Sequence, residues 1–393
     1  MKVLIVHNRY QQPGGEDICV EQEAALLRRH GHEVIEYRRS NEEVSAFGLL
    51  DKLTLPKRMI WANDAADDLR ALIQRERPEV AHFHNTHFMI SPIAYHVCQD
   101  MRVPVVKTLH NYRLLCPDAF FFRDGHVCED CLGKAVAWPG VVHACYRDSA
   151  AQSAAVAATL SVHRAMGTWA TQIDRYIALT EFGRQKFIAG GLPAEKIVVK
   201  PNFIYPDPGA GTDERNHMLY VGRLSEEKGV RTLLQAWLSL RHIPLRIVGG
   251  GPLQGEMQTF IRVHQLENVE LVGPQPYEAT LNMLKAARGL VCPSLWYEGQ
   301  ARVIIEAFAC GTPVITTRLG SNEEVVEDGR TGYHTIPGDA LDLAAKIEKL
   351  WTQPQHSAEM GIAARQEFAA KFTAERNYER LLQIYEAVRF QAT

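Results

Sequence analysis

The chain has 393 residues, of which 46% are hydrophobic and 23% are charged, and its formal net charge is −3. This length predicts two domains, and the composition is that of a globular protein rather than a disordered or fibrous one. The slight negative charge gives no bulk attraction to nucleic acid, so we expect none as a partner.

The N-terminal sequence and the number of cysteines indicate the cellular compartment in which the protein is expected. The opening MKVLIVHN has one lysine and a short apolar run, which predicts a buried strand and is too short for a signal peptide. The most apolar long stretch, 150–172, contains His163 and Arg164, so it predicts a helix that does not span a membrane. Eight cysteines without an export signal favour reduced thiols or metal ligands over disulfides. We therefore expect a cytoplasmic protein, either free or in contact with the inner face of the membrane.

Strand-like and helix-like segments alternate along the first half of the chain. A helix over 16–30 ends at Gly31, and the predicted strands are 2–6, 33–37, 79–83, 103–109, 174–179 and 196–200. Such alternation predicts a parallel sheet with crossover helices. We therefore expect a Rossmann-like domain over 1–200.

The second half repeats this pattern after a break. Residues 201–216 have the proline, glycine and charge content of a linker. The strands that follow are predicted at 218–223, 245–250, 269–273, 289–293 and 314–317. They predict a second Rossmann-like domain over 217–372. The segment 373–393 contains an amphipathic helix over 373–389, which either packs locally or crosses back to the first domain.

Residues 298–313 read EGQARVIIEAFACGTP and place two carboxylates, Glu298 and Glu306, eight positions apart. Glu298 follows the strand 289–293, and ligands of open α/β sheets bind beyond the carboxyl ends of the strands. The next three amides lie near the first turn of a helix, where N–H groups attract anions and hydroxyl groups. The spacing suits one carboxylate on a sugar and the other on the ribose of a nucleotide-sugar. The alternative is two surface glutamates on an amphipathic helix.

Two further turns follow strands of the same domain. VGRLSEEKGV (221–230) carries Arg223 and Lys228, a cationic pair that suits a diphosphate, although two solvated surface charges are the alternative. GGGP (249–252) lets the backbone approach a ligand closely, or is simply a tight turn. Three such turns in one domain favour a nucleotide-sugar site.

VGRLSEEKG, GGGP and EGQARVIIEAFACGTPVI together resemble the nucleotide-binding domain of the retaining glycosyltransferases of family 4, the glycogen-synthase-like kind. The resemblance runs over nearly the whole chain and is densest from 218 to 335. It implies an α/β protein of GT-B architecture, in which two Rossmann-like domains with parallel sheets face each other across a cleft. The first domain would bind the acceptor and the second the nucleotide-sugar donor.

The resemblance also implies roles for single residues. The catalytic residues would be His110, Glu298, Arg223 and Lys228. Arg223 and Lys228 would hold the donor diphosphate, and Glu298 would bind a hydroxyl of the donor sugar. The donor-binding residues would be Gly14, Gly15, Gly250, Gly299, Gln300, Ala301 and Glu306, the last of these on the ribose. Family members often have Gly-Phe-Gly after the first glutamate, whereas this chain has Gly299-Gln300-Ala301. The resemblance therefore does not determine the identity of the donor sugar.

The loop and helix start over 13–23 (PGGEDICVEQE) have two interpretations. The two glycines, Gly14 and Gly15, would approach the donor phosphate and the acceptor, as the resemblance implies. Glu16 and Asp17 either cap the following helix or contact the acceptor. His110, at the end of the strand VVKTLH, is either structural or, as the resemblance implies, beside the reacting sugar.

The implied reaction is the transfer of a hexose from a UDP- or GDP-linked donor to a saccharide or lipid-linked acceptor, in surface polysaccharide or glycan biosynthesis. No enzyme nucleophile is evident, so retention would follow a front-face displacement in which Arg223 and Lys228 offset the charge on the leaving diphosphate. The chain has no Asp-x-Asp motif, and we expect no cofactor in catalysis. The alternatives are a nucleotide-sugar epimerase or phosphorylase, or a non-catalytic nucleotide-sugar-binding protein on the same fold.

Residues 110–149 form a cysteine-rich insertion. Half of the eight cysteines lie here: Cys116, Cys128, Cys131 and Cys145. The spacing of Cys128 and Cys131 is that of a zinc knuckle, and two more thiols would complete a structural zinc site, with His126 and His143 as substitute ligands. Unligated thiols in a loop and a disulfide are the alternatives.

The same insertion carries aromatic residues, Phe120, Phe121, Phe122 and Trp138. They either cover a small core or contact a lipid-linked acceptor. The remaining cysteines are predicted to be ordinary buried residues: Cys19, Cys98, Cys292 and Cys310.

Overall fold

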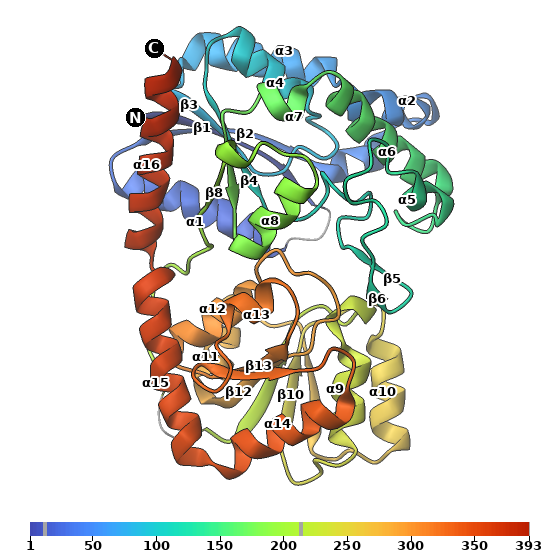
Figure 1. The fold of residues 1–393 in the computed structure, drawn as a ribbon, viewed down its shortest axis with the longest axis vertical. Helices are drawn as coiled ribbons and strands as arrows, with labels where there is room; N and C mark the ends of the chain where they lie inside the picture. Colours follow the sequence, from blue (N-terminus) through green and yellow to red (C-terminus); the bar gives the residue numbers. More distant parts are fainter. Residues whose placement is uncertain (11–13, 212–214, 393) are drawn as a thin grey trace. The chain divides into compact units, whose positions relative to one another are not determined.

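Two parallel sheets organise the protein, each within its own unit. The computed structural model describes residues 1–10, 14–211 and 215–392. The first unit comprises Met1–Phe121, Glu129–Asn202 and Asn377–Thr393, and the second comprises Phe122–Cys128 and Phe203–Arg376. Each contains a six-stranded sheet with helices between its strands (Figure 1). The predicted α/β class with two parallel sheets is therefore confirmed.

The sheet of the first unit has the order β2-β1-β3-β4-β7-β8, and all neighbours are parallel. Its strands are β1 (Lys2–Arg9), β2 (Glu33–Ser40), β3 (Val80–Phe83), β4 (Val105–Leu109), β7 (Arg175–Ala178) and β8 (Ile197–Val199). The register pairs His82 of β3 with Ile5 on one side and Val106 on the other. This histidine therefore lies between apolar residues of the two neighbouring strands.

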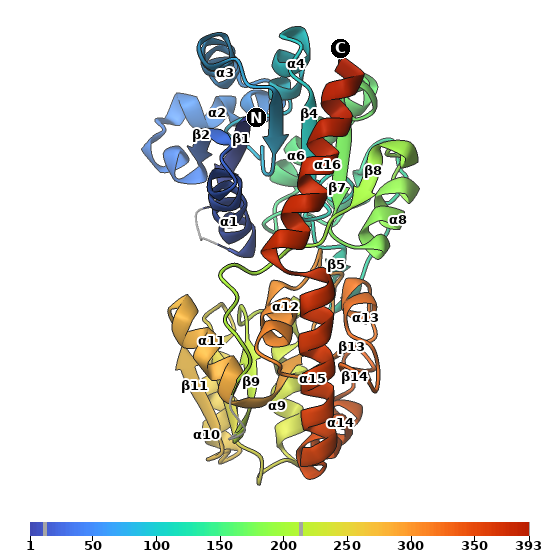
Figure 2. The same ribbon diagram turned by 90° about the vertical axis from the view of Figure 1, so that its left-hand side faces the viewer.

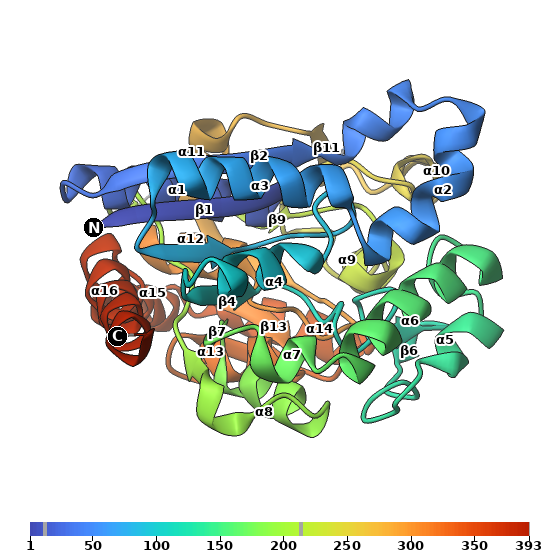
Figure 3. The ribbon, with the colours of Figure 1, turned by 90° about the horizontal axis from the view of Figure 1, so that it is seen from above.

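The helices of the first unit connect these strands. They are α1 (Gly15–Arg29), η1 (Asn41–Ala46), α2 (Leu49–Ile60), α3 (Asn63–Glu76), α4 (Ile93–Asp100), α5 (Trp138–Val142), α6 (Ala150–Ala165), α7 (Thr168–Thr171), α8 (Glu181–Ala189), η2 (Ala194–Lys196) and α16 (Ala374–Ala392). α5 packs against α6, as Figure 3 shows in green. The helix predicted over 16–30 is α1, and the strand predicted over 33–37 extends to Ser40.

The C-terminal helix α16 completes the core of the first unit. Leu381, Tyr385 and Val388 are buried in one cluster with α1 and the strands. Figure 2 shows the helix itself, in red, beside the strands of this unit. The cluster members from α1 and the sheet are Val3, Ile5, Val20, Ala24, Leu27, Val80, Val106 and Ile177. The core of the first unit therefore needs segments from both ends of the chain. Burial of their apolar side chains is the main contribution that stabilises it.

The sheet of the second unit has the order β11-β10-β9-β12-β13-β14, again all parallel. Its strands are β9 (His217–Val221), β10 (Leu245–Val248), β11 (Val269–Gly273), β12 (Ala287–Cys292), β13 (Val314–Thr317) and β14 (Gly332–Thr335). Its helices are η3 (Glu226–Lys228), α9 (Val230–Trp237), α10 (Gln254–Val263), α11 (Tyr277–Ala286), α12 (Arg302–Ala309), α13 (Ser321–Val325), α14 (Ala340–Thr352) and α15 (Pro354–Lys371).

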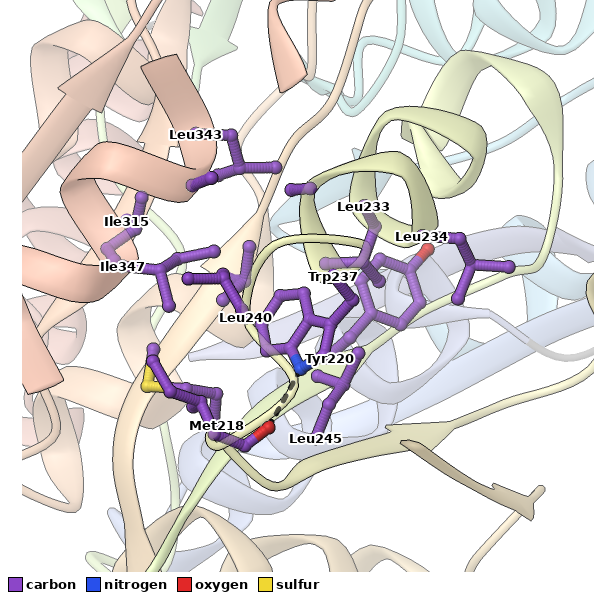
Figure 4. Packing of buried hydrophobic residues seen from close by; sticks show 14 of the residues in the cluster. Met218, Tyr220, Leu233, Leu234, Trp237, Leu240, Leu245, Ile315, Leu343 and Ile347 are labelled. Atoms are coloured by element: carbon purple, nitrogen blue, oxygen red, sulfur yellow. Dashed lines mark hydrogen bonds between the residues drawn. The ribbon is translucent and has the colours of Figure 1, made fainter. Parts of the chain in front are cut away.

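Two apolar clusters cover this sheet. In one, Trp237 of α9 is fully buried among residues of α14 and the strands, and its indole N–H donates to the carbonyl of Ile243 at 2.9 Å (Figure 4). The other packs α11, α12 and α15 against the sheet and includes Ile304 and Phe308. Successive residues of β9, Met218 and Leu219, belong to different clusters, as the alternation of side chains along a strand requires.

The boundaries of the units differ from the predicted domains in two places. The predicted insertion 110–149 is divided, because the hairpin of β5 (Phe122–Arg123) and β6 (His126–Val127) belongs to the second unit. The predicted linker 201–216 contributes to the second unit from Phe203 onward, and its residues 212–214 lie outside the described residues. In the described part of the chain, no helix has both the length and the apolar character that crossing a membrane requires.

Candidate functional site

The loops after β9 and β12 hold each other closely. Gly229 has a left-handed φ of 70°, and a Cβ there would lie 1.9 Å from the carbonyl oxygen of Pro293. The amide of Leu295 also donates to the carbonyl of Glu227 at 2.8 Å. The glycine is therefore required for the turn that brings Lys228 to the loop carrying Glu298.

Lys228 and Glu298 form an ion pair, with 2.7 Å between Nζ and Oε1. The same carboxylate oxygen accepts hydrogen bonds from the hydroxyl of Ser294 at 2.8 Å and the indole N–H of Trp296 at 3.0 Å. Glu298 is buried, and Lys228 keeps a quarter of its side chain exposed. Burial alone would lower the pKa of Lys228, but Glu298 outweighs it and raises that pKa above its ordinary value. The ammonium is therefore held charged at the carboxyl end of the sheet.

Arg223 lies at a different position from Lys228. It follows β9 in an exposed loop, where its carbonyl accepts a hydrogen bond from Tyr220 at 2.8 Å. Among the described residues its guanidinium has no ion pair. The predicted cation pair therefore consists of one partly exposed ammonium that is paired with Glu298 and one exposed guanidinium.

Glu306 is paired with a residue that the sequence did not single out. Arg302, one turn earlier on α12, donates from Nε to Glu306 Oε1 at 2.9 Å, and both side chains are 8% exposed. The guanidinium also lies 3.4 Å from the hydroxyl of Tyr277. Burial and the nearby Glu306 raise the pKa of Tyr277 to about 12, so its hydroxyl stays protonated. The i,i+4 spacing of Arg302 and Glu306 was the available signal.

Gly299, Gln300 and Ala301 come directly before α12, with Ala301 at its N-cap position. The hydroxyl of Ser321 donates to the carbonyl of Glu298 at 2.7 Å and fixes the start of this loop. Gln300 and Ala301 are buried. The three residues thus form the loop that leads from Glu298 into the first turn of α12, the helix that carries Glu306.

The glycine turn after β10 has a packing reason. A Cβ on Gly249 would lie 2.0 Å from the carbonyl oxygen of Gly222, and one on Gly251 would lie 2.5 Å from that of Leu224. Gly250 has no such close neighbour. Two of the three glycines are therefore explained by contact with the loop after β9, and only Gly250 remains a candidate for ligand approach.

In the first unit, Gly14 is the N-cap of α1 and Gly15 its first residue, while Pro13 of the predicted loop lies outside the described residues. The amide of Gly14 donates to Asp17 Oδ2 at 2.8 Å, and Asp17 Oδ1 lies 2.8 Å from His7 Nε2. Burial would raise the pKa of Asp17, but these two partners lower it. Asp17 therefore has the capping role, one of its two predicted alternatives.

Glu16 is directed differently from Asp17. Its Oε2 lies 3.2 Å from the hydroxyl of Tyr10 and 3.5 Å from the amide nitrogen of Asn111. Burial raises the pKa of Glu16 above its ordinary value. This carboxyl group therefore lies beside the residue that follows His110.

His110 directly follows β4, and its Nε2 lies 2.9 Å from Nδ1 of His84, which directly follows Phe83 at the end of β3. Burial lowers the pKa of His110 well below its ordinary value and that of His84 to about 3. Both rings are therefore neutral near pH 7. His84 is a residue that sequence reasoning missed, although two histidines at the carboxyl ends of neighbouring strands were a usable signal.

None of the four clustered cysteines forms a disulfide in the described structure. Among the described residues, one group of three side chains could share a metal ion, and it is Glu23, His82 and His84 rather than any of these cysteines. Cys128 belongs to the second unit, whereas Cys116, Cys131 and Cys145 belong to the first. The structure thus gives no zinc geometry, and the zinc site stays a prediction.

The aromatic residues of the insertion divide between core and surface. Phe121 is buried and packs on Tyr112, with 5.2 Å between ring centroids. Trp138 is 56% exposed, and the ammonium of Lys134 lies 5.7 Å from its ring centroid. Phe120 and Phe122 are partly buried. Cys19, Cys98, Cys292 and Cys310 are buried as predicted.

Two family models account for most of the chain. Residues 207–367 match the family described as "Glycosyl transferases group 1", and residues 13–207 match "Glycosyltransferase Family 4". The chain is a family 4-like glycosyltransferase with the GT-B fold. This favours transfer over the epimerase and phosphorylase alternatives.

Individual relatives of this glycosyltransferase agree with the family. It is 35% identical over 160 residues to a glycogen synthase of Mycobacterium tuberculosis, covering 39% of this chain and 38% of the relative. It is 29% identical over 230 residues to the amylovoran biosynthesis glycosyltransferase AmsK of Erwinia amylovora, covering 55% and 56%. The match therefore spans less than two thirds of either relative.

Solved structures show the same fold. The crystal structure of Anabaena Alr3699/HepE in complex with UDP-glucose superimposes with a TM-score of 0.67 at 18% identity, covering 99% of each chain. At this identity the likeness concerns the fold alone, and it extends over both units of the glycosyltransferase.

Proposed function

We propose that this glycosyltransferase is a retaining hexosyltransferase. It moves a hexose from a UDP- or GDP-linked donor to a saccharide or lipid-linked acceptor during assembly of a surface polysaccharide or glycan. The observation that carries the proposal is the ion pair of the partly exposed Lys228 with the buried Glu298, which lies where the strands of the second unit end. The names of two relatives support it, since AmsK is named for amylovoran biosynthesis and HepE was solved with UDP-glucose.

Lys228 is suited to the donor diphosphate. An ammonium has three N–H donors, and Glu298 takes one of them. The described residues give the others no hydrogen-bond partner, so they are available to phosphate oxygens. The exposed Arg223 adds a guanidinium that can bind two phosphate oxygens at once.

Glu306 is suited to the ribose in the company of Arg302. The buried guanidinium holds the carboxylate in one orientation, and a carboxylate can accept from two neighbouring hydroxyl groups. Gln300 and Ala301, in place of the usual Phe-Gly of the family, would shape the pocket of the donor sugar.

Without an enzyme nucleophile, retention requires the acceptor to attack from the face that the leaving group occupies. In the proposed step, the bond between the sugar C1 and the diphosphate oxygen breaks as the acceptor oxygen bonds to C1. The acceptor proton passes to the departing diphosphate oxygen. Lys228 and Arg223 stabilise the negative charge that develops there, which is the kind of electrostatic contribution that dominates many catalysed reactions.

A panel of UDP- and GDP-sugars tests the proposal. The protein is incubated with each donor, with and without saccharide acceptors, and free nucleotide and sugar products are measured. Nucleotide release that depends on the protein supports a transferase. An epimerised donor without release, or donor binding without any product, would contradict the proposal and favour one of the two alternatives.

A further inference from the structure

A buried polar chain in the first unit ends at His110. It begins at Glu23 of α1, whose side chain is 5% exposed, and passes through His84, which is 1% exposed. Glu23 Oε1 lies 3.5 Å from His84 Nε2, and His84 Nδ1 lies 2.9 Å from His110 Nε2. The rings of His84 and His110 are stacked with centroids 5.2 Å apart. His82 Nδ1 lies nearer to the same oxygen, at 2.9 Å, whereas His84 Nε2 has no hydrogen bond among the described residues, and Glu23 Oε1 is the carboxylate oxygen that it faces.

We propose that Glu23 and His84 are positioning residues that fix the tautomer of His110. This inference rests on the proposed function, in which His110 lies beside the reacting sugar. A carboxylate only accepts hydrogen bonds, so His84 carries its proton on Nε2, which faces Glu23. His84 Nδ1 is then an acceptor, and His110 must donate to it from Nε2. His110 Nδ1 is left with its lone pair, ready to accept a hydrogen bond from a hydroxyl group.

The surroundings of Glu23 keep it in the ionised form that this chain needs. Lys200, directly after β8, donates to Glu23 Oε2 at 2.9 Å, and His82 Nδ1 lies 2.9 Å from Oε1. Burial alone would raise the pKa of Glu23, but Lys200 and His82 hold it well below its ordinary value. The carboxylate is therefore an acceptor on both oxygens near pH 7.

The other elements around the chain add fixed partners. Tyr385 of α16 lies 2.7 Å from His82 Nδ1, and Thr108 of β4 lies 2.8 Å from His82 Nε2. Lys107 of β4 donates to the carbonyl of His84 at 3.2 Å. His7 of β1 faces the rings from the remaining side, with its centroid 6.3 Å from that of His84. His82 is thus held by Tyr385 and Thr108, and its ring packs against that of His84 with 4.3 Å between the centroids.

A metal ion held by Glu23, His82 and His84 fits these contacts less well. The three side chains are close enough together to share an ion. The Lys200 ammonium already neutralises the carboxylate, and His82 Nδ1 already has the hydroxyl of Tyr385 within hydrogen-bond distance. A cation there would have to displace the second contact and bear repulsion from the first.

Glu23→Gln is a sharp variant because its geometry predicts the opposite tautomer. Lys200 donates to one oxygen of Glu23, so the amide oxygen of glutamine faces Lys200 and its NH₂ faces His84. His84 Nε2 would then accept, His84 Nδ1 would donate, and His110 Nε2 would have to accept. The proton of His110 would move to Nδ1.

The test is ¹⁵N NMR of imidazole rings in protein labelled at histidine, with the His110 signals assigned by comparison with His110→Gln. We expect wild-type His110 to be neutral with its proton on Nε2, and Glu23→Gln to show it on Nδ1. Turnover of Glu23→Gln should fall by roughly tenfold or more, since the wrong tautomer disables a reacting imidazole. Glu348→Gln, beside the exposed His242, is the matched control and should change neither quantity.

The wild-type spectrum decides the proposal even if Glu23→Gln does not fold. A His110 proton on Nδ1, a doubly protonated ring at pH 7, or ring signals displaced by a bound metal would overturn the proposed chain. If the tautomers are as expected but no donor is turned over, the chain stands and the proposed function fails. If donors are turned over but the tautomer is wrong, the reverse holds.

Discussion

The two units hold their buried carboxylates in different ways. In the second unit each of the two predicted site glutamates has one cation of its own: Lys228 lies 2.7 Å from Glu298 and Arg302 lies 2.9 Å from Glu306. In the first unit a single carboxylate, Glu23, gathers Lys200 and the rings of two histidines. The second unit thus holds a set of fixed charges, whereas the first unit holds a hydrogen-bonded network in which the position of each proton is fixed.

This difference suits two kinds of ligand. Fixed charges stabilise the charge of a diphosphate, and they do so most effectively when they need no reorganisation. Oriented neutral imidazoles instead accept or donate single hydrogen bonds to hydroxyl groups. The comparison therefore predicts that substitutions in the second unit change charge stabilisation, and that substitutions in the first change hydrogen-bond direction.

The largest expected effect is on the stability of the second unit. Arg302→Met leaves Glu306 buried without its cation, and we expect the free energy of unfolding to fall by roughly 3–5 kcal/mol. Denaturant titration measures it. Arg70→Met, in an exposed pair with Asp67, is the control and should cost about 1 kcal/mol or less. The double variant Arg302→Met with Glu306→Gln should regain part of the loss. Equal losses of unfolding free energy for Arg302→Met and the control would show that Arg302 does not stabilise the buried Glu306.

The next effect is on turnover. Lys228→Met should lower kcat by about 10²- to 10³-fold, because the ammonium acts on charge that develops in the transition state. Steady-state kinetics measures kcat and KM separately. Lys371→Met, which removes an exposed ammonium paired with Glu367 while Arg330 remains paired with the same carboxylate, is the matched control and should be near wild type. A change confined to KM would mean that Lys228 only binds the donor.

A smaller effect concerns pH and the first unit. Burial lowers the pKa of His84 to about 3, whereas an unfolded histidine titrates near 6.5. The contribution of His84 to the free energy of unfolding is therefore fully present above about pH 6.5. It is lost as the pH drops toward 3, because in this range only the unfolded state takes up the proton. The contribution of one such group is at most about 1.4 kcal/mol per pH unit.

Unfolding free energies of the wild type and His84→Gln between pH 7 and 5 check this sign. The variant should show a shallower loss of stability on acidification. His242→Gln, at an exposed position, should keep the wild-type slope. Parallel slopes for all three proteins would remove His84 from the titration.

The smallest effect concerns the segment shared by both units. If Cys116, Cys128, Cys131 and Cys145 bind a structural zinc, protein purified without a histidine tag should contain about one zinc per chain by elemental analysis. Cys128→Ser should then lose it and depress activity indirectly. Zinc well below one equivalent, or four thiols that titrate freely in the native protein, would leave these residues as unligated cysteines.

The second unit could be predicted from the sequence in detail because its candidate site residues lie in short, contiguous motifs. The strands predicted over 269–273 and 314–317 have the observed bounds, and Lys228, Glu298 and Glu306 lie in turns or helices directly after strands. The strand of this sheet that was missed is β14 (Gly332–Thr335), a four-residue strand too short for a clear pattern. The pairing of Lys228 with Glu298 could not be predicted, since 70 positions separate them and only the Gly229 turn brings them together.

The first unit could be predicted only in outline. Its strands follow the alternation of apolar segments, but Glu23, His84, Lys200 and Tyr385 come from four separate parts of the chain. Each is unremarkable alone, because a buried histidine or a helical glutamate is usually a packing residue. What joins them is the order of strands in the sheet and the return of α16, and neither is written in any local pattern.

The configuration of the transferred sugar tests the central claim most directly. Once the donor is identified, ¹H NMR can follow the anomeric proton of the first product formed, before any later equilibration. Front-face displacement assisted by Lys228 predicts the same anomeric configuration as in the donor, in the presence of EDTA as well as in its absence. An inverted product, or prompt loss of transfer in EDTA that Mg²⁺ restores, would contradict it.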